Sequence, residues 1–265
     1  MRRNIKELIS LKALRHLFYL PIIIFKIENW YSFIMNYIGF KNEVNTYKFR
    51  NGIKIKTDEG VDAATIAVIF IKKDYGKIKD NSIIIDIGAN IGVFSIYAAS
   101  TSKNAIVYAY EPMPKSYSLL LKNININKFE RNILPFKLGV GTKKEKRKLF
   151  LASGSPFHSL YTVNEADKNY LEIECVSLKD ILESNYIKEC DILKIDCEGA
   201  EFEILYNTPS EYFKRIKKIR LEYHNRKTKN HNIQSLTKFI ENNGFKLTHF
   251  REDSKISGNA WFKKV

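Results

Sequence analysis

The sequence predicts an α/β protein built on a doubly wound, mostly parallel β-sheet. Short apolar runs rich in β-branched residues, such as Ile83–Ile85 and Ile192–Ile195, alternate with segments of helical periodicity. Runs of this kind are typical of strands that are buried on both faces. Helices that join parallel strands form right-handed crossovers, and ligands bind outside the carboxyl ends of such strands. We therefore expect the functional residues at the strand ends.

The expected elements follow this alternation along the chain. Asn51-Gly52 predicts a hairpin within residues 46–57. Tyr117, Leu120 and Ile124 share one helical face, which predicts an amphipathic crossover helix over 116–127. Further strands are expected at 105–110, 133–138, 148–152, 172–176, 192–195 and 216–223, further helices at 61–71, 199–206 and 233–240, and a closing antiparallel pair at 245–250 and 260–265.

The first 47 residues differ from the rest, so we expect an N-terminal amphipathic helical extension (1–47) and a main domain (48–265). Basic and apolar side chains alternate within residues 2–15, and Leu17–Phe25 is too short to span a bilayer. No small-residue cleavage site follows, so we expect a cytoplasmic protein without a secretory signal. The extension either packs on a neighbouring domain, which is the commoner use of such helices, or lies on the inner face of the membrane.

Composition narrows the class of protein. With 265 residues, 45% hydrophobic and 28% charged, the chain suits a globular protein. Its net charge of +15 would suit nucleic acid, a membrane surface or an acidic glycan, but the lysines are scattered, which favours a general compositional bias. The three cysteines, Cys175, Cys190 and Cys197, show no CxxC spacing. They indicate a reducing compartment and argue against a zinc site or a disulfide framework.

A glycine-containing turn follows the strand at 83–85. Asp86 ends the apolar run, and Gly88, Asn90 and Gly92 lead into a helix. The next strand ends in Glu111, followed by Pro112. Glu111 comes about 20 residues after the glycine turn, which is the sequence spacing at which an acid accepts the hydroxyls of a ribose. Because Asn90 stands where GxGxxG has a glycine, the turn suits a nucleoside without phosphates, such as S-adenosylmethionine, better than a dinucleotide. Any doubly wound unit could also carry two glycines and an acid.

Acidic residues end two later strands. Asp196 and Glu198 follow the strand at 192–195, and Glu222 and His224 end the strand at 216–223. Closely spaced carboxylates cost stability by repulsion unless a cation or a proton transfer uses them. His224 is either a base that titrates near neutral pH or a polar cap. Glu201 follows at a helix N-terminus, where the helix dipole alone favours an acid.

The order of these motifs resembles that of the FkbM-type methyltransferase family. The matching pieces are DIGANIG (86–92), YEP (110–112), SPFHSLY (155–161), LKIDCEGAE (193–201) and EYHN (222–225). The resemblance covers residues 47–265 and implies the Rossmann-like class I methyltransferase fold. It also implies S-adenosylmethionine-dependent O-methylation, commonly of a sugar hydroxyl in a glycan or glycoconjugate. In this family Asp86 would face the methionine end of the cofactor and Glu111 its ribose.

The expected reaction is direct displacement, in which the protein aligns the two reactants and removes the hydroxyl proton. His224 or Asp196 is the candidate base, and Glu198 and Glu222 would orient the acceptor. His158, in a polar loop, either closes over the site or is solvated. No metal centre is expected, and Asp196 with Glu222 is the pair that we considered for a divalent cation.

Two other functions compete with this one. An RNA methyltransferase on the same fold would suit the charge, but the chain has no Pro-Pro strand end and its acidic strand ends would repel phosphates. A non-catalytic module could instead hold a glycan-assembly system at a membrane through residues 1–47. We favour a glycan partner over nucleic acid.

Overall fold

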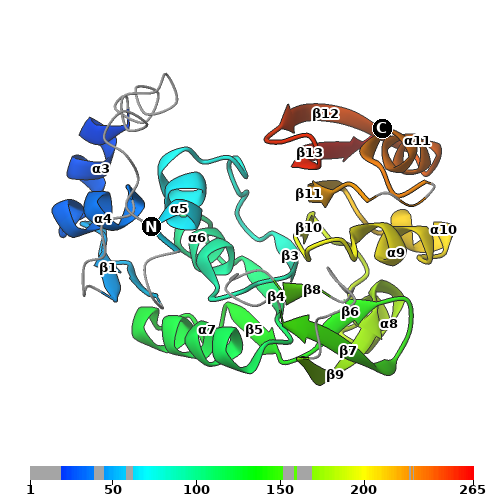
Figure 1. Cartoon of the computed structure of the whole chain (residues 1–265), viewed down its shortest axis with the longest axis horizontal. Coiled ribbons are helices and arrows are strands. Elements are labelled where there is room, and N and C mark those ends of the chain that lie inside the picture. Colours follow the sequence, from blue (N-terminus) through cyan, green and yellow to red (C-terminus); the bar gives the residue numbers. More distant parts are fainter. Residues whose placement is uncertain are drawn as a thin grey trace. The chain divides into compact units, whose positions relative to one another are not determined.

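The structure is a computed structural model that describes residues 19–38, 45–57, 62–151, 158–159, 169–226, 228 and 230–265 (Figure 1). Contacts divide the chain into two units, Met1–Lys77 and Ile78–Val265, and we describe each by itself. The division falls later than the expected boundary after residue 47. Residues after 47 belong to the first unit because Phe49 forms a β-bridge with Ile27, and Lys26 donates a hydrogen bond to the carbonyl of Phe70 (2.9 Å).

The N-terminal unit contains short helices and one hairpin. Its elements are α3 (Leu20–Lys26), α4 (Trp30–Tyr37), β1 (Thr46–Lys48), β2 (Lys54–Lys56), α5 (Asp62–Ile66) and a π-helical turn, η1 (Ala67–Ile71). The antiparallel pairing of β1 with β2 confirms the Asn51-Gly52 hairpin. No helix within the described residues is long and apolar enough to cross a membrane. Residues 1–18 lie outside the described residues, so the role of the extension stays a prediction.

The second unit is organised around a seven-stranded sheet, which confirms the predicted fold class. Its strands are β3 (Ile83–Ile87), β4 (Ile106–Tyr110), β5 (Ile133–Phe136), β10 (Ile192–Ile195), β11 (Lys218–His224), β12 (Phe245–Glu252) and β13 (Ser257–Lys264). They lie in the order β12-β13-β11-β10-β3-β4-β5, and β13 is antiparallel to both of its neighbours. The chain therefore builds outward from β3 in one direction and then returns to β10 on its other side. This reversal creates a switch point at the carboxyl ends of β3 and β10, where ligands of such sheets bind.

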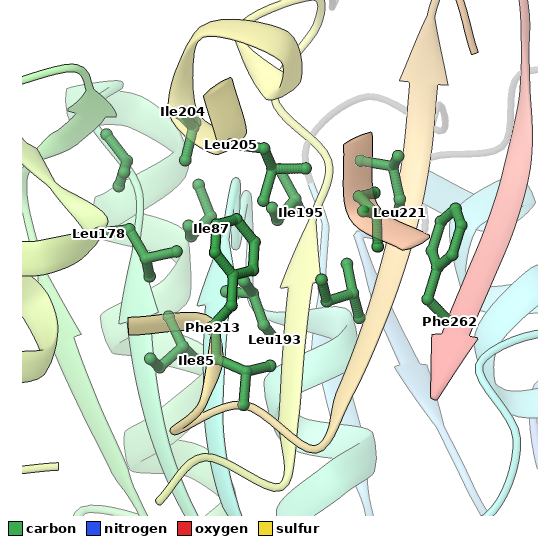
Figure 2. Packing of buried hydrophobic residues seen from close by; sticks show 14 of the residues in the cluster. Ile85, Ile87, Leu178, Leu193, Ile195, Ile204, Leu205, Phe213, Leu221 and Phe262 are labelled. Carbon is green, nitrogen blue, oxygen red and sulfur yellow. The ribbon is translucent and has the colours of Figure 1, made fainter. Parts of the chain in front are cut away.

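Helices cover both faces of this sheet (Figure 1). Ile85 and Ile87 point to one face, where they join the core under α8 (Leu178–Ser184), α9 (Glu201–Tyr206), α10 (Ser210–Phe213) and α11 (Ile233–Asn242). Figure 2 shows this core, with Leu193, Ile195 and Leu221 from the neighbouring strands. Because side chains alternate along a strand, Asp86 points to the opposite face, which α6 (Val93–Thr101) and α7 (Pro114–Asn127) cover.

A second, four-stranded sheet is inserted between β5 and β10. It consists of β6 (Gly139–Gly141), β7 (Glu145–Leu151), β8 (His158–Ser159) and β9 (Tyr170–Ser177), in the order β6-β9-β7-β8. Arg147 of β7 forms an ion pair with Glu203 of α9, which joins the insertion to the main sheet. The expected strand at 172–176 is thus part of the longer β9. Residues 148–151 of the other expected strand lie in β7, and residue 152 lies outside the described residues. Much of the SPFHSLY loop lies outside the described residues.

The ends of β3 and β10 approach each other so closely that only glycine fits at residue 88. Gly88 has a φ of +74°, and a Cβ atom built there would lie 1.7 Å from the carbonyl oxygen of Asp196. Gly244 has a comparable φ of +87°, but nothing lies within 4 Å of its Cβ position. An alanine at residue 88 would therefore meet both backbone strain and steric overlap, whereas an alanine at residue 244 would meet backbone strain alone.

We expect Gly88→Ala to lower the free energy of unfolding by about 2–5 kcal/mol, the sum of left-handed strain and overpacking. Gly244→Ala should cost only the strain, about 1–2 kcal/mol. Chemical denaturation of the two variants and the wild type measures both values. Equal losses would show that the close approach of the two strand ends does not constrain residue 88.

Candidate active site

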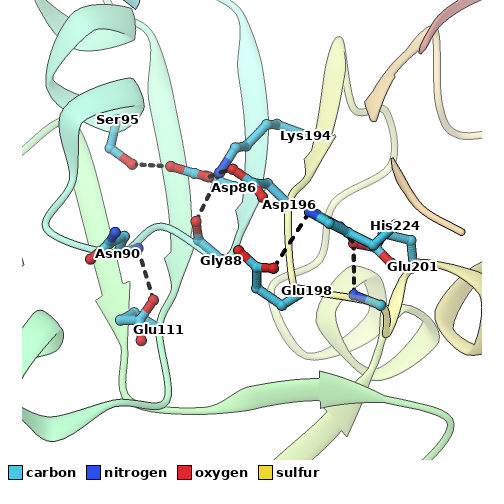
Figure 3. Close-up of polar contacts among 11 residues, drawn as sticks. Asp86, Gly88, Asn90, Ser95, Glu111, Lys194, Asp196, Glu198, Glu201 and His224 are labelled. Atoms are coloured by element: carbon cyan, nitrogen blue, oxygen red, sulfur yellow. Dashed lines mark hydrogen bonds and ion pairs between the residues drawn. The ribbon is translucent and has the colours of Figure 1, made fainter. Parts of the chain in front are cut away.

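A buried lysine joins the two strand ends at the switch point. Lys194 on β10 lies directly beside Asp86 on β3, and its Nζ is 3.0 Å from Asp86 Oδ1. The same ammonium donates a hydrogen bond to the carbonyl of Gly88 (2.8 Å) and lies 3.7 Å from Asp196 Oδ2 (Figure 3). Ser95 donates to the other oxygen of Asp86 at 2.6 Å. Burial alone would lower the pKa of Lys194, but the charges of Asp86 and Asp196 raise it, so the lysine stays charged.

The glycine turn is fastened to the next strand end through Glu111. One oxygen of its carboxylate accepts the backbone N–H of Asn90 (2.8 Å), and the other accepts that of Met113 (2.9 Å). Asn90 itself adopts a left-handed conformation, with a φ of 51°. Burial raises the pKa of Glu111 to about 7, although the two amides oppose this shift. Each oxygen keeps a second lone pair, so Glu111 can still accept hydrogen bonds from a ligand.

Two glutamates hold the imidazole of His224 between them. Nδ1 lies 2.7 Å from Oε1 of Glu201, whose side chain is fully buried, and Nε2 lies 3.4 Å from Oε2 of Glu198 (Figure 3). Burial alone would lower the pKa of His224, but the hydrogen bond to Glu201 and the two negative charges raise it to about 10. His224 is therefore protonated at neutral pH, which differs from the expected base that titrates near neutrality.

The remaining carboxylates lie in the same partly buried region. The charge of Asp196 and burial together raise the pKa of Glu222 on β11. Burial raises the pKa of Glu198 to about 7, and the charge of His224 opposes this shift. One donor atom each from Asp196, Glu198 and His224 lies within 4.8 Å of the others. Carboxyls that titrate close to neutral pH suit proton transfer or cation binding.

The structure thus brings together the four residues predicted to be catalytic, and their roles stay predictions. Two other residues were missed or read differently. The signal for Lys194 was a charged residue inside the apolar run Ile192–Ile195. Glu201 does lie in the first turn of α9, but its carboxylate contacts His224 and the amide of Gly199. Its role as a simple helix-end acid was therefore incomplete, because the sequence does not show that β11 places His224 above it.

The residues predicted to bind the cofactor surround the glycine turn, with one difference. Asp86 has no exposed surface and lies beneath the turn, where Ser95 and Lys194 occupy its oxygens. Gly92 is the N-cap residue of α6, with a φ of +87°, and Pro112 follows Glu111. His158 lies on β8, where it pairs with Leu151 of β7.

We expect Glu201→Gln to lower the pKa of His224 from about 10 toward its ordinary value, because the variant removes a buried negative charge. NMR titration of the imidazole resonances in chelator-treated protein measures the change, with His224→Asn to assign the signal. The folded state binds this proton more tightly than the unfolded state. The stabilisation it brings is therefore complete below about pH 6.5 and is lost as the pH rises through 10.

Glu241→Gln on α11 is the matched control, since Glu241 is exposed. An unchanged pKa in Glu201→Gln would mean that Glu201 does not determine the charge of His224.

Comparison with known proteins agrees with this geometry. Residues 86–247 match the methyltransferase FkbM domain. The chain is 25% identical over 209 residues to methyltransferase sdnD from Sordaria araneosa, covering 68% of this chain and 80% of that protein. It is 24% identical over 127 residues to the hexuronic acid methyltransferase AglP from Haloferax volcanii, covering 48% of this chain and 50% of that protein.

The fold agrees as well. The crystal structure of methyltransferase FkbM from Methylobacillus flagellatus superposes with a TM-score of 0.50 at 16% identity. The match covers 74% of this chain and 47% of that longer one. The family match spans more than half of the 265 residues and includes the glycine turn, Lys194 and the acidic strand ends. The chain belongs to the FkbM family of methyltransferases and has the class I fold of S-adenosylmethionine-dependent methyltransferases.

Proposed function

We propose that this protein is an O-methyltransferase that transfers the methyl group of S-adenosylmethionine to a sugar hydroxyl in a glycan or glycoconjugate. The observation that carries the proposal is the junction at Lys194. This one buried side chain contacts the glycine turn, which would bind the cofactor, and also Asp196. Asp196 belongs to a group of residues at the ends of β10 and β11 that we call the acidic edge: Asp196, Glu198, Glu222 and His224. A cofactor site and an acceptor site are thereby held next to each other.

The residues around the glycine turn fit the cofactor. Glu111 has unused lone pairs for the two hydroxyls of a ribose, and Asn90 stands where a phosphate-binding turn would need a glycine. Gly88 and Gly92 allow the turn to pack closely, because a Cβ atom there would meet the carbonyl of Asp196 and the side chain of Leu120, respectively. We assign Asp86 an indirect part, since its oxygens hold Lys194 and Ser95. Pro112 ends the strand behind Glu111.

The acidic edge suits an acceptor that offers hydroxyl groups. Carboxylates accept hydrogen bonds from hydroxyls. The edge offers three of them, Asp196, Glu198 and Glu222, which are close enough for their charges to affect one another's pKa values. The same charges oppose the approach of a phosphate backbone, which argues against RNA despite the net charge of +15. The relative AglP, named a hexuronic acid methyltransferase, supports a sugar as the acceptor.

When bound, S-adenosylmethionine supplies a methyl group whose bonding electron pair stays on sulfur as the methyl is transferred. The protein therefore has only the hydroxyl proton to accept. Asp196 and Glu222 are close enough for the charge of one to raise the pKa of the other. Glu222, whose pKa is raised to about 8, can therefore take up the hydroxyl proton near neutral pH. His224 is already protonated and therefore orients the acceptor together with Glu198.

Incubation with methyl-labelled S-adenosylmethionine and extracts from the protein's own host tests the proposal. We expect the label in the glycan or glycoconjugate fraction, on an oxygen atom of a sugar that NMR can identify. Label in the RNA fraction, together with RNA binding that weakens steeply with salt, would favour the competing function.

Glu222→Gln should reduce turnover by about 10²–10⁴-fold, the usual contribution of a positioned base, because the amide cannot accept the proton of the acceptor hydroxyl. Its affinity for the cofactor should stay within about twofold of the wild type, since β10 lies between β11, which carries Glu222, and β3, which leads into the glycine turn. Steady-state kinetics and calorimetry measure the two effects, and Glu241→Gln serves as the control. Lost cofactor affinity with normal turnover at saturation would place Glu222 in the cofactor site instead.

A further inference from the structure

The acidic edge has the donor set of a metal site. Asp196 and Glu198 follow β10, and His224 ends β11, so two neighbouring parallel strands deliver the three groups to one place. One donor atom from each lies within 4.8 Å of the others. Their side chains are 29%, 28% and 23% exposed, respectively, so an ion from solvent can reach them.

Glu201 supplies an independent observation, because it lies behind the cluster and is not one of its donors. Its carboxylate is fully buried and holds Nδ1 of His224 at 2.7 Å, which directs Nε2 toward Glu198 (Figure 3). Histidines that bind metals usually donate their other N–H to a carboxylate in this way. The second oxygen of Glu201 is buried and has no hydrogen-bond partner among the described residues. The buried negative charge therefore lacks full compensation within this part of the chain.

The balance of charges also favours a cation. Asp196, Glu198, Glu201 and Glu222 act electrostatically on one another or on His224. Lys194 is the buried cation next to Asp196, but its ammonium is shared with Asp86 and the carbonyl of Gly88. A divalent ion at the edge would offset this repulsion while displacing the proton from Nε2 of His224.

We propose that Asp196, Glu198 and His224 bind a divalent first-row metal ion, with Glu201 as the outer partner of His224. Two carboxylates and an imidazole suit Mn²⁺, Fe²⁺ or Zn²⁺ better than Mg²⁺, which prefers oxygen ligands alone. The role of the ion rests on the proposed function: it would bind the acceptor hydroxyl and lower the pKa of that hydroxyl. The binding itself does not depend on that function.

Mn²⁺ is the probe, because its free form is detected by electron paramagnetic resonance. The full-length protein is treated with EDTA, dialysed and titrated with Mn²⁺. We expect one equivalent to bind, and Glu198→Gln and His224→Asn to weaken binding at least tenfold. Glu201→Gln should weaken it by about 10–100-fold, as outer partners of metal-bound histidines do. Glu241→Gln should bind like the wild type.

Two further measurements guard against misfolded variants. Bound Mn²⁺ should raise the unfolding temperature of the wild type, as any ligand of the folded state does. Glu198→Asp keeps a carboxylate and should recover most of the affinity that Glu198→Gln loses. If a variant unfolds differently from the wild type in the absence of metal, its binding result is set aside. The comparison of Glu198→Asp with the wild type then tests the site.

The proposal is overturned if the wild type binds no stoichiometric Mn²⁺, or if the substitutions at Glu198, His224 and Glu201 leave binding unchanged. Binding of the metal without methyl transfer to glycans would contradict the proposed function and leave the metal site standing. If the protein binds no Mn²⁺ and EDTA does not affect methyl transfer to glycans, the metal site is overturned and the proposed function stands.

Discussion

The site depends on one buried ammonium, that of Lys194. Taking a charge out of water is costly unless other groups compensate it, and here Asp86, the Gly88 carbonyl and Asp196 do so. Satisfying this charge fixes the end of β3 against the end of β10. The close contact of Gly88 with the Asp196 carbonyl is the steric counterpart of the same constraint. The cofactor turn and the acidic edge consequently share one rigid support.

The second principle of the site is an excess of carboxylates over cations. Burial and mutual repulsion raise the pKa values of Glu111, Glu198 and Glu222, and the carboxylates around His224 raise its pKa as well. All of these shifts express an environment that favours added positive charge, whether it arrives as a proton or as a metal ion. The same environment is suited to hydroxyl acceptors and unsuited to phosphates. It connects the proposed reaction with the proposed ion.

Local patterns predicted the framework of the fold because they depend on short-range physics. The hairpin at Asn51-Gly52 follows from the left-handed conformation that Gly52 adopts, with a φ of +89°. The buried strands at 83–87 and 192–195 follow from runs of apolar, mostly β-branched residues. The rule that ligands bind at the carboxyl ends of strands then placed the glycine turn and both acidic motifs on one edge.

The sequence by itself determined the order of elements, the family motifs and the set of polar residues at the strand ends. Only the tertiary structure decided how those residues pair. Lys194 meets Asp86 because β10 lies beside β3, although 108 residues separate them in the chain. Glu201 meets His224 through the packing of α9 under β11. Such contacts depend on the order and register of the strands, which are set by the packing of the whole sheet and leave no periodic trace in the local sequence.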